Sequence, residues 1–118
     1  MLWPAVGRRI TQYFKWRHQA IDIGGKNGID PIYAAENGVV ESAGWGRGGW
    51  GNTIIVNHGN GMKTRYSHAN KIFVSPGETV QKGQTIALIG STGRSTGPHV
   101  DFRVYITGRT VNPLQYMR

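Results

Sequence analysis

Hydrophobic and polar residues alternate in short runs along most of the chain, and residues typical of tight turns separate these runs. A period of two is typical of β-strands that bury one face. No long segment shows the period of about 3.6 residues that marks an amphipathic helix. The runs predicted as strands are 8–13, 20–23, 31–34, 38–43, 53–57, 63–67, 85–89 and 99–106.

The segments between these runs are rich in turn-forming residues, and the chain contains 18 Gly and 5 Pro. Asn37-Gly38 and Asn60-Gly61 are hairpin-type dipeptides, because both residue types tolerate positive φ. Near the end, Asn112 is expected to cap a short turn with Pro113 at its first helical position. Without internal repeats or linkers, we predict one all-β domain over residues 1–118, built as two packed antiparallel sheets or a partly open barrel.

Length, composition and charge narrow the functional class. A chain of 118 residues suits one core, and no apolar stretch approaches the roughly 20 residues needed to span a bilayer. The absence of Cys excludes disulfides, thiolate zinc sites and a Cys nucleophile. The 14 Lys and Arg against 6 Asp and Glu give a net charge of +8, which favours an anionic partner such as nucleic acid, a lipid surface or a bacterial cell wall.

The start of the chain lacks the basic residues, apolar core and small-residue cleavage site of a signal peptide. We therefore expect either a protein that stays inside the cell or a domain cut from a longer exported protein.

The predicted strand 99–106 carries the clearest candidate chemistry. Its period places His99, Asp101, Arg103 and Tyr105 on one face, opposite an apolar core face. The polar face therefore holds two groups that can bind a metal or move a proton, directly after a glycine-rich loop.

Two other segments carry similar groups. His18 and Asp22 share a face if the predicted strand 20–23 reaches back to His18, and alternation places Tyr66 and His68 on one face. Imidazole and carboxylate groups both suit Zn²⁺. Because three of the four His and two Asp lie on segments that could converge, the pattern favours a metal site.

Each of these residues also has a simpler explanation. A single His-x-x-x-Asp is common by chance, and a strand face with His and Asp is compatible with ordinary solvation. His58 is expected to be a structural turn residue. Lys63, Arg65 and Arg103 are most simply solvated charges.

Taken together, the motifs resemble the M23 family of zinc metallopeptidases, of the lysostaphin or LytM type. They are His18-x-x-x-Asp22, Tyr66-Ser67-His68 and the segment 91–99, which reads Ser-Thr-Gly-Arg-Ser-Thr-Gly-Pro-His. The resemblance runs from about Gly7 to Pro113. It implies a small antiparallel β core with a substrate groove and zinc-dependent cleavage of peptide cross-links in bacterial peptidoglycan. It also implies a location in the cell envelope or outside the cell, and we expect a monomer.

The resemblance assigns roles to individual residues. It implies that His18 and Asp22 bind zinc and that His68 and His99 handle protons beside the metal. The third zinc ligand of the family is a His two residues after the one that matches His99, and here that residue is Asp101. Asp also binds zinc, so an open tetrahedral site remains feasible. A second carboxylate is expected to lower metal affinity and activity and to favour ions such as Mn²⁺.

The expected activity requires a groove that binds the substrate. The loops 44–51 and 90–98 are expected to form its walls, where glycine lets an extended peptide approach closely. Tyr66, Tyr13 and Trp50 are the candidate substrate-binding aromatics. Packing in the protein interior is the alternative for Tyr66 and Trp50.

Three functions remain open from the sequence. The first is a metalloendopeptidase with a variant metal site. The second, which Asp101 favours, is a non-catalytic M23-like domain that binds the wall or activates other hydrolases. The third is a basic β-barrel that binds single-stranded nucleic acid. The third leaves the clustered His and Asp residues unexplained, so no nucleic-acid partner is expected.

Overall fold

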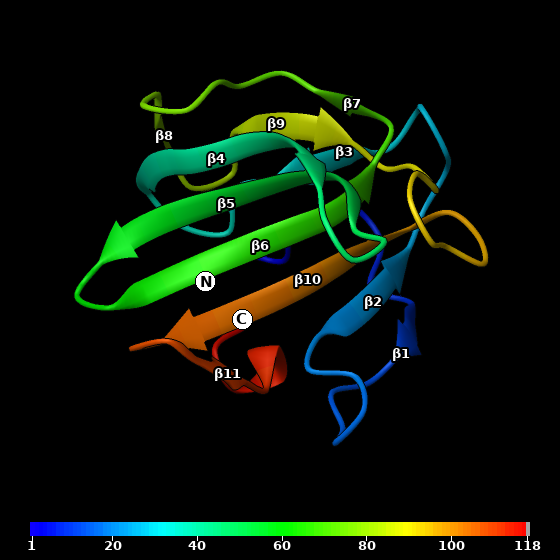
Figure 1. The fold of residues 1–118 in the computed structure, drawn as a ribbon, viewed down its shortest axis with the longest axis horizontal. Helices are drawn as coiled ribbons and strands as arrows, with labels where there is room; N and C mark the ends of the chain where they lie inside the picture. Colours follow the sequence, from blue (N-terminus) through cyan, green and yellow to red (C-terminus); the bar gives the residue numbers. More distant parts are fainter. Residues whose placement is uncertain (118) are drawn as a thin grey trace.

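The chain folds into one large and one small antiparallel sheet, as seen in a computed structural model that describes residues 1–117 (Figure 1). The strands are β1 (Ile10–Gln12), β2 (Ile21–Gly24), β3 (Pro31–Tyr33), β4 (Gly38–Gly46), β5 (Gly51–Gly59), β6 (Met62–Ala69), β7 (Lys71–Ile72), β8 (Thr79–Val80), β9 (Thr85–Leu88), β10 (His99–Ile106) and β11 (Arg109–Val111). A single 3-10 helix, η1 (Pro113–Gln115), lies near the end of the described residues.

The large sheet has the strand order β1-β2-β10-β6-β5-β4-β8, with β11 paired to β10. The small sheet has the order β3-β9-β7 and lies behind the upper part of the large one in Figure 1. The predicted all-β fold is therefore confirmed, in its two-sheet form. The strands β7, β8 and β11, which have two or three residues each, were not predicted.

The hydrophobic core lies between the two sheets and joins them. Val100, Phe102 and Val104 are fully buried along one face of β10, as the alternation predicts. They belong to the same core cluster as Ile32 of β3 and Ile86 of β9. Because the core takes this face of β10, the opposite face is left for polar side chains.

The turns agree with the sequence in two places and differ in one. Asn60 and Gly61 join β5 to β6 with φ values of 53° and 80°, which confirms that hairpin. The Asn112 side chain accepts a hydrogen bond from the Leu114 amide at 3.1 Å, which confirms the cap of η1. The predicted hairpin at Asn37-Gly38 is wrong, because β4 pairs with β5 and β8 and not with the preceding strand β3.

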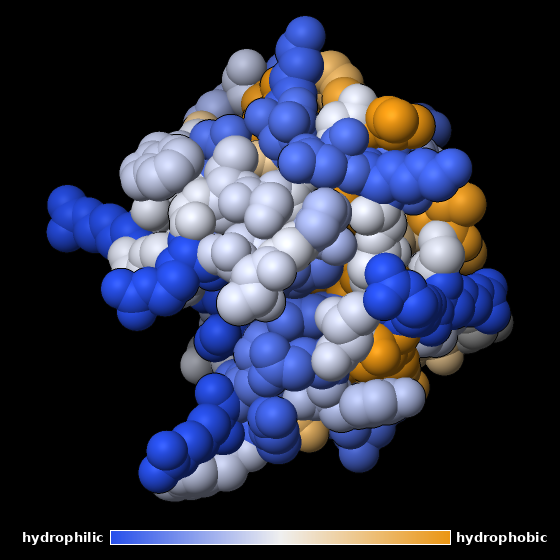
Figure 2. Space-filling model, turned by 90° about the vertical axis from the view of Figure 1, so that its right-hand side faces the viewer, coloured by the Kyte–Doolittle hydropathy of each residue, from blue (hydrophilic) through white to orange (hydrophobic). Residues whose placement is uncertain are grey.

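Two loops come together at one end of the large sheet, where β10 begins (Figure 1). The amide of Arg94 donates to the Gly49 carbonyl at 2.7 Å, so the loop 90–98 is fixed against the turn between β4 and β5. The open hollow between these loops has a volume of about 760 Å³ and is lined in part by Trp45, Arg47 and Arg94. Figure 2 shows this end as a mainly hydrophilic surface. Within residues 1–117, no helix has the length and apolar character needed to cross a membrane.

Candidate metal and catalytic site

Two aspartates lie directly opposite each other on neighbouring strands. β2 and β10 are antiparallel, and their register pairs Asp22 with Asp101. Only 6% of Asp22 and 7% of Asp101 is exposed to solvent. Like charges directly opposite across a strand pair are destabilising, and burial increases the cost. Such an arrangement needs cationic partners, and each aspartate has a different set.

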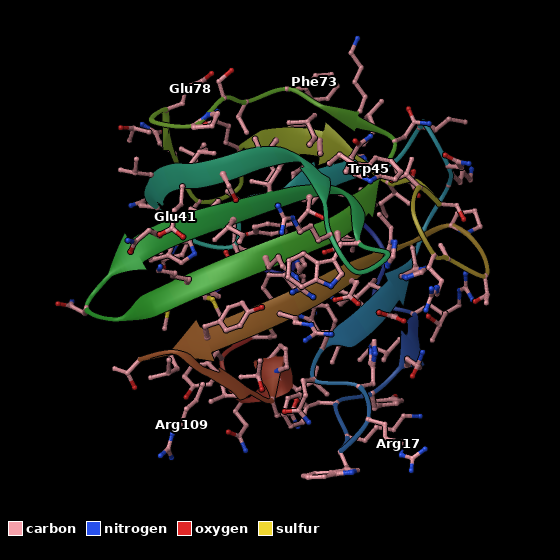
Figure 3. The ribbon with its side chains drawn as sticks, in the orientation of Figure 1. Arg17, Glu41, Trp45, Phe73, Glu78 and Arg109 are labelled. Carbon is pink, nitrogen blue, oxygen red and sulfur yellow. The ribbon has the colours of Figure 1, made fainter. Side chains whose placement is uncertain are left out.

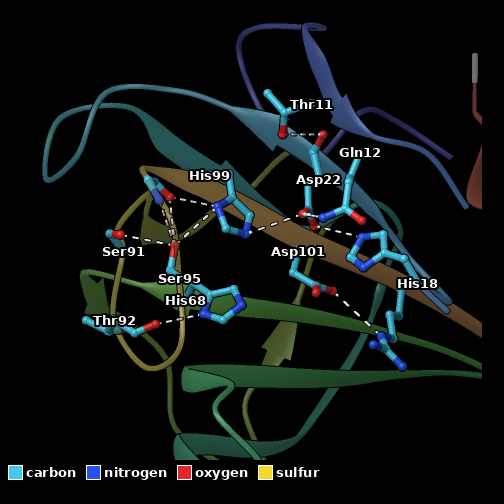
Figure 4. Close-up of polar contacts among 12 residues, drawn as sticks. Thr11, Gln12, His18, Asp22, His68, Ser91, Thr92, Ser95, His99 and Asp101 are labelled. Atoms are coloured by element: carbon cyan, nitrogen blue, oxygen red, sulfur yellow. Dashed lines mark hydrogen bonds and ion pairs between the residues drawn. The ribbon is translucent and has the colours of Figure 1, made fainter.

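Asp22 is surrounded by hydrogen-bonding side chains (Figure 4). Its Oδ1 lies 3.1 Å from His18 Nε2, and its Oδ2 accepts a hydrogen bond from Gln12 Nε2 at 3.3 Å. His99 Nε2 lies 3.7 Å from the same Oδ2. Burial raises the pKa of Asp22 above the usual carboxyl value, and Asp101 acts in the same direction, whereas His99 and His18 lower it.

His18 is held by a tight turn that precedes β2. Its backbone amide and carbonyl pair with those of Lys15, and the Gln19 side chain donates to the carbonyls of Lys15 and Trp16. β2 itself begins only at Ile21, so His18 reaches Asp22 from this turn and not from an extended strand.

Asp101 has guanidinium neighbours in place of imidazoles. Its Oδ1 lies 3.9 Å from Arg65 Nη2 and 3.7 Å from Arg103 Nε. Arg65 is 1% exposed, its guanidinium lies 3.5 Å from the Trp50 ring centroid, and it donates to the Tyr105 hydroxyl at 3.0 Å. Burial lowers the pKa of Arg65 to about 10, so it remains charged at neutral pH. The interpretation of Arg65 as a solvated charge is wrong, because Trp50 covers it.

His68 and His99 form a pair beside the two carboxylates. Their ring centroids lie 4.9 Å apart. His68 Nδ1 lies 2.7 Å from the Thr92 carbonyl, and His99 Nδ1 lies 2.7 Å from the Gly97 carbonyl. A carbonyl oxygen can only accept a hydrogen bond, so each Nδ1 carries a proton and each Nε2 of the neutral rings is free to accept one. This orientation suits both rings to proton transfer.

A bulge in β6 brings His68 to this pair. His68 has a φ of 67°, and β6 places three residue steps between Tyr66 and Ala69 where β5 places two between Ile54 and Asn52. The extra residue turns His68 to the side of His99 and leaves Tyr66 on the core face. The expectation that these two side chains share a face is therefore wrong.

Tyr66 lies in the core and not in the site. It is 0% exposed, and its hydroxyl accepts hydrogen bonds from the Ala35 amide at 3.0 Å and from Thr64 Oγ1 at 2.7 Å. Its ring packs against Phe102. These contacts match the interior-packing alternative, and Tyr66 does not reach a bound substrate from this position.

The predicted metal and proton-handling residues converge in one pocket of about 210 Å³. The residues that line it are Gln12, His18, Asp22, His68, Arg94, Ser95, Thr96, His99 and Asp101. Gln12 was not predicted as a site residue, whereas Arg94, Ser95 and Thr96 belong to the loop 90–98 that was predicted as a wall of the groove. Gln12 follows the alternation of its strand, but only the pairing of β1 with β2 sets it beside Asp22.

The other predicted residues lie outside this pocket. Tyr13 is 59% exposed, and Trp50 is half-buried over Arg65. His58 is structural, as expected, but it lies in β5 and not in a turn: its Nδ1 lies 2.8 Å from the Asn37 carbonyl, and its Nε2 lies 2.8 Å from Thr64 Oγ1.

The donor set of the pocket fits one divalent cation. His18, Asp22 and Asp101 each offer a ligand atom, and these three atoms lie within 4.8 Å of one another. Bonds from Zn²⁺ to nitrogen and oxygen are about 2.0–2.2 Å, so the ligand atoms of a tetrahedral ion lie about 3.4 Å apart. Small side-chain movements are enough to close the cluster around an ion.

Comparison with known proteins agrees with this geometry. The family model described as Peptidase family M23 matches residues 16–113. This chain belongs to peptidase family M23. The M23 domain is 41% identical over 85 residues to the peptidoglycan DD-endopeptidase ShyA of Vibrio cholerae, covering 72% of this chain and 20% of ShyA. It is 42% identical over 96 residues to the lipoprotein NlpD of Yersinia enterocolitica, covering 81% of this chain and 97% of that protein.

Solved structures of the family share the fold of this domain. A zinc-containing peptidase from Vibrio cholerae superimposes with a TM-score of 0.84 at 35% identity, covering 89% of this chain and 35% of that one. The M23 domain spans only 20 to 27% of the length of several curated relatives.

Proposed function

We propose that this M23 domain is a metal-dependent endopeptidase that cleaves peptide cross-links of bacterial peptidoglycan, with Zn²⁺ as the expected ion. The observation that carries the proposal is the convergence of the ligand cluster His18, Asp22 and Asp101 with the pair His68 and His99 in one pocket. The likeness to a peptidoglycan DD-endopeptidase supports the substrate class.

The roles of the side chains follow from their orientation. His18, Asp22 and Asp101 would hold the ion. When bound, a divalent cation supplies a Lewis acid that polarises a carbonyl and makes a water more acidic. The free Nε2 of His68 or His99 accepts the proton of the attacking water. The other imidazole, when protonated, donates a hydrogen bond to the developing oxyanion, and a proton then passes to the leaving amine.

The substrate would lie as an extended peptide between the loops 44–51 and 90–98. Tyr13, which is largely exposed, and Trp50, which lines a shallow pocket with Trp45, are the proposed aromatic contacts. The charge of +8 suits an anionic cell wall. We place this activity in the cell envelope or outside the cell, in a monomer.

A second candidate function is a non-catalytic domain that binds the wall or activates another hydrolase. Asp101 favours this alternative, because its Oδ1 already lies near two guanidinium groups that would compete with a bound metal ion. On this alternative the pocket would bind a peptide without cutting it.

The test is to measure metal content and wall cleavage on the same sample. We expect about one equivalent of zinc by elemental analysis and release of peptide fragments from purified cell walls, detected by mass spectrometry. A His18→Ala variant and treatment with a chelator should abolish both signals. A metal-loaded protein that sediments with cell walls but never releases fragments would contradict the proposal and support the second candidate.

A further inference from the structure

Four buried polar atoms meet around Asp101, and none of them has a hydrogen-bond partner among the described residues. They are Asp101 Oδ1, Arg65 Nε and Nη2, and Arg103 Nε. Buried polar atoms are nearly always hydrogen-bonded, so a cluster of unpaired ones beside a candidate site points to a functional role. Here the only carboxylate oxygen of the cluster lies 3.7–3.9 Å from the donors on both arginines.

The two arginines are placed there by the sheet. β6 and β10 are antiparallel, and their register sets Arg65 opposite Arg103. Two cations opposite each other repel, just as Asp22 and Asp101 repel each other on the adjoining pair of strands. The arginine pair and the aspartate pair are adjacent on one face, so each offsets the charge of the other.

Arg65 is held in this place more firmly than an ordinary surface arginine. Trp50 stacks over its guanidinium, and Tyr105 accepts a hydrogen bond from its Nη1. The surrounding packing thus fixes the cation, while the contact to Asp101 remains longer than a hydrogen bond. Asp101 lies between the two sets of partners, because it is near both arginines and also offers a ligand atom within 4.8 Å of those of His18 and Asp22.

We propose, building on the metal site described under the proposed function, that Arg65 is a positioning residue that acts as the internal counter-ion of Asp101 and sets the metal affinity of the site. Without metal, Arg65 and Arg103 offset the charge of the second carboxylate. When a metal binds, Asp101 must be shared between the ion and the arginines. The arginines therefore make an aspartate tolerable at this position and weaken the binding of the ion.

The test compares zinc affinity in Arg65→Met and in the wild-type chain, by competition with a chromogenic chelator. Met keeps an apolar stem beneath Trp50 and removes the charge. We expect Arg65→Met to bind zinc about tenfold more tightly, because Asp101 then has no competing cation. Arg65→Lys, which keeps the charge, should remain within about threefold of wild type.

The dependence on Asp101 separates this role from simple repulsion of the ion. In an Asp101→Asn background no carboxylate is shared, so Arg65→Met should change zinc affinity by no more than about threefold. The control is Arg109→Met, which removes an exposed cation far from the loop 90–98 (Figure 3) and should leave zinc affinity unchanged. If Arg65→Met does not fold, Arg103→Met at a less buried position should tighten binding in the same direction, about threefold.

The outcomes distinguish this inference from the proposed function. Wild-type affinity in Arg65→Met, or an equal gain from that substitution with and without the Asp101→Asn change, would overturn the counter-ion role while leaving the peptidase proposal intact. If the wild-type chain binds no divalent cation, the proposed function fails and the counter-ion role fails with it.

Discussion

Asp22 and Asp101 are the same residue type, lie directly opposite each other and are almost equally buried, but their surroundings differ. Asp22 lies beside imidazole and amide groups that hydrogen-bond to it and carry no permanent charge to compete with an ion. Asp101 is met by two permanent cations that compete with any ion. The side chains that surround each carboxylate, more than the residue type, therefore decide how well it serves as a metal ligand.

The largest expected effect concerns the two histidines beside the carboxylates, His68 and His99. His68→Gln and His99→Gln should each lower peptide hydrolysis by about 10²–10⁴-fold, because each removes one proton-transfer group. Zinc affinity should be unchanged in His68→Gln. It should change a few-fold in His99→Gln, because His99 lies 3.7 Å from Asp22. Fragment release from cell walls and chelator competition measure the two quantities, and full activity in either variant would contradict the assigned roles.

The next effect compares the aspartates directly. Asp22→Asn should lower zinc affinity by at least about 100-fold, whereas Asp101→Asn should lower it by about tenfold, because Asp101 already shares its charge with arginines. Glu78→Gln, at an exposed carboxylate on the other side of the molecule (Figure 3), is the control and should bind zinc normally. Equal losses in the two Asn variants would show that the surroundings of the aspartates do not matter.

A third variant restores the residue that the family has at position 101. Asp101→His alone should tighten zinc binding by about tenfold, because an imidazole ligand is not shared with Arg65 and Arg103. Adding Arg65→Met to Asp101→His should then change the affinity by no more than about threefold, since no carboxylate remains for which the arginine could compete. Isothermal titration with zinc measures both, and a tenfold gain from Arg65→Met in the Asp101→His background would show that the arginine repels the ion directly.

The smallest expected effect concerns His58, which lies outside the metal site and makes the stability of the fold depend on pH. Burial lowers the pKa of His58 below its usual value of 6.5, so the fold prefers the neutral ring. The stability that this contributes is complete above pH 6.5 and is lost as the pH falls through the lower pKa of the folded state. In the presence of chelator, His58→Gln should therefore lose less thermal stability between pH 7.5 and 5 than wild type, as followed by circular dichroism.

Much of the site could be predicted because β10 shows its pattern plainly. Its alternation separates His99 and Asp101 from Val100 and Phe102, and the structure keeps that division. The spacing of His18 and Asp22 suggested the other half of the cluster, and the resemblance to the M23 family assigned it to the metal. Both features are local, so a single sequence is enough to reveal them.

The surroundings of the site could not be predicted, since they depend on which strands pair and in which register. Arg65 was predicted to be solvated, because nothing in the sequence near it indicates that Trp50 covers it. Trp50 comes from the turn between β4 and β5. Gln12 reaches Asp22 only through the pairing of β1 with β2. The face of His68 depended on one residue in the left-handed region, which alternation alone cannot detect.

The left-handed backbone of His68 limits how this site can be transferred to another protein. Grafting the five side chains onto a regular antiparallel sheet would point the imidazole of position 68 into the interior, because regular alternation places it with Tyr66. A designer would have to transfer the irregular backbone together with the side chains.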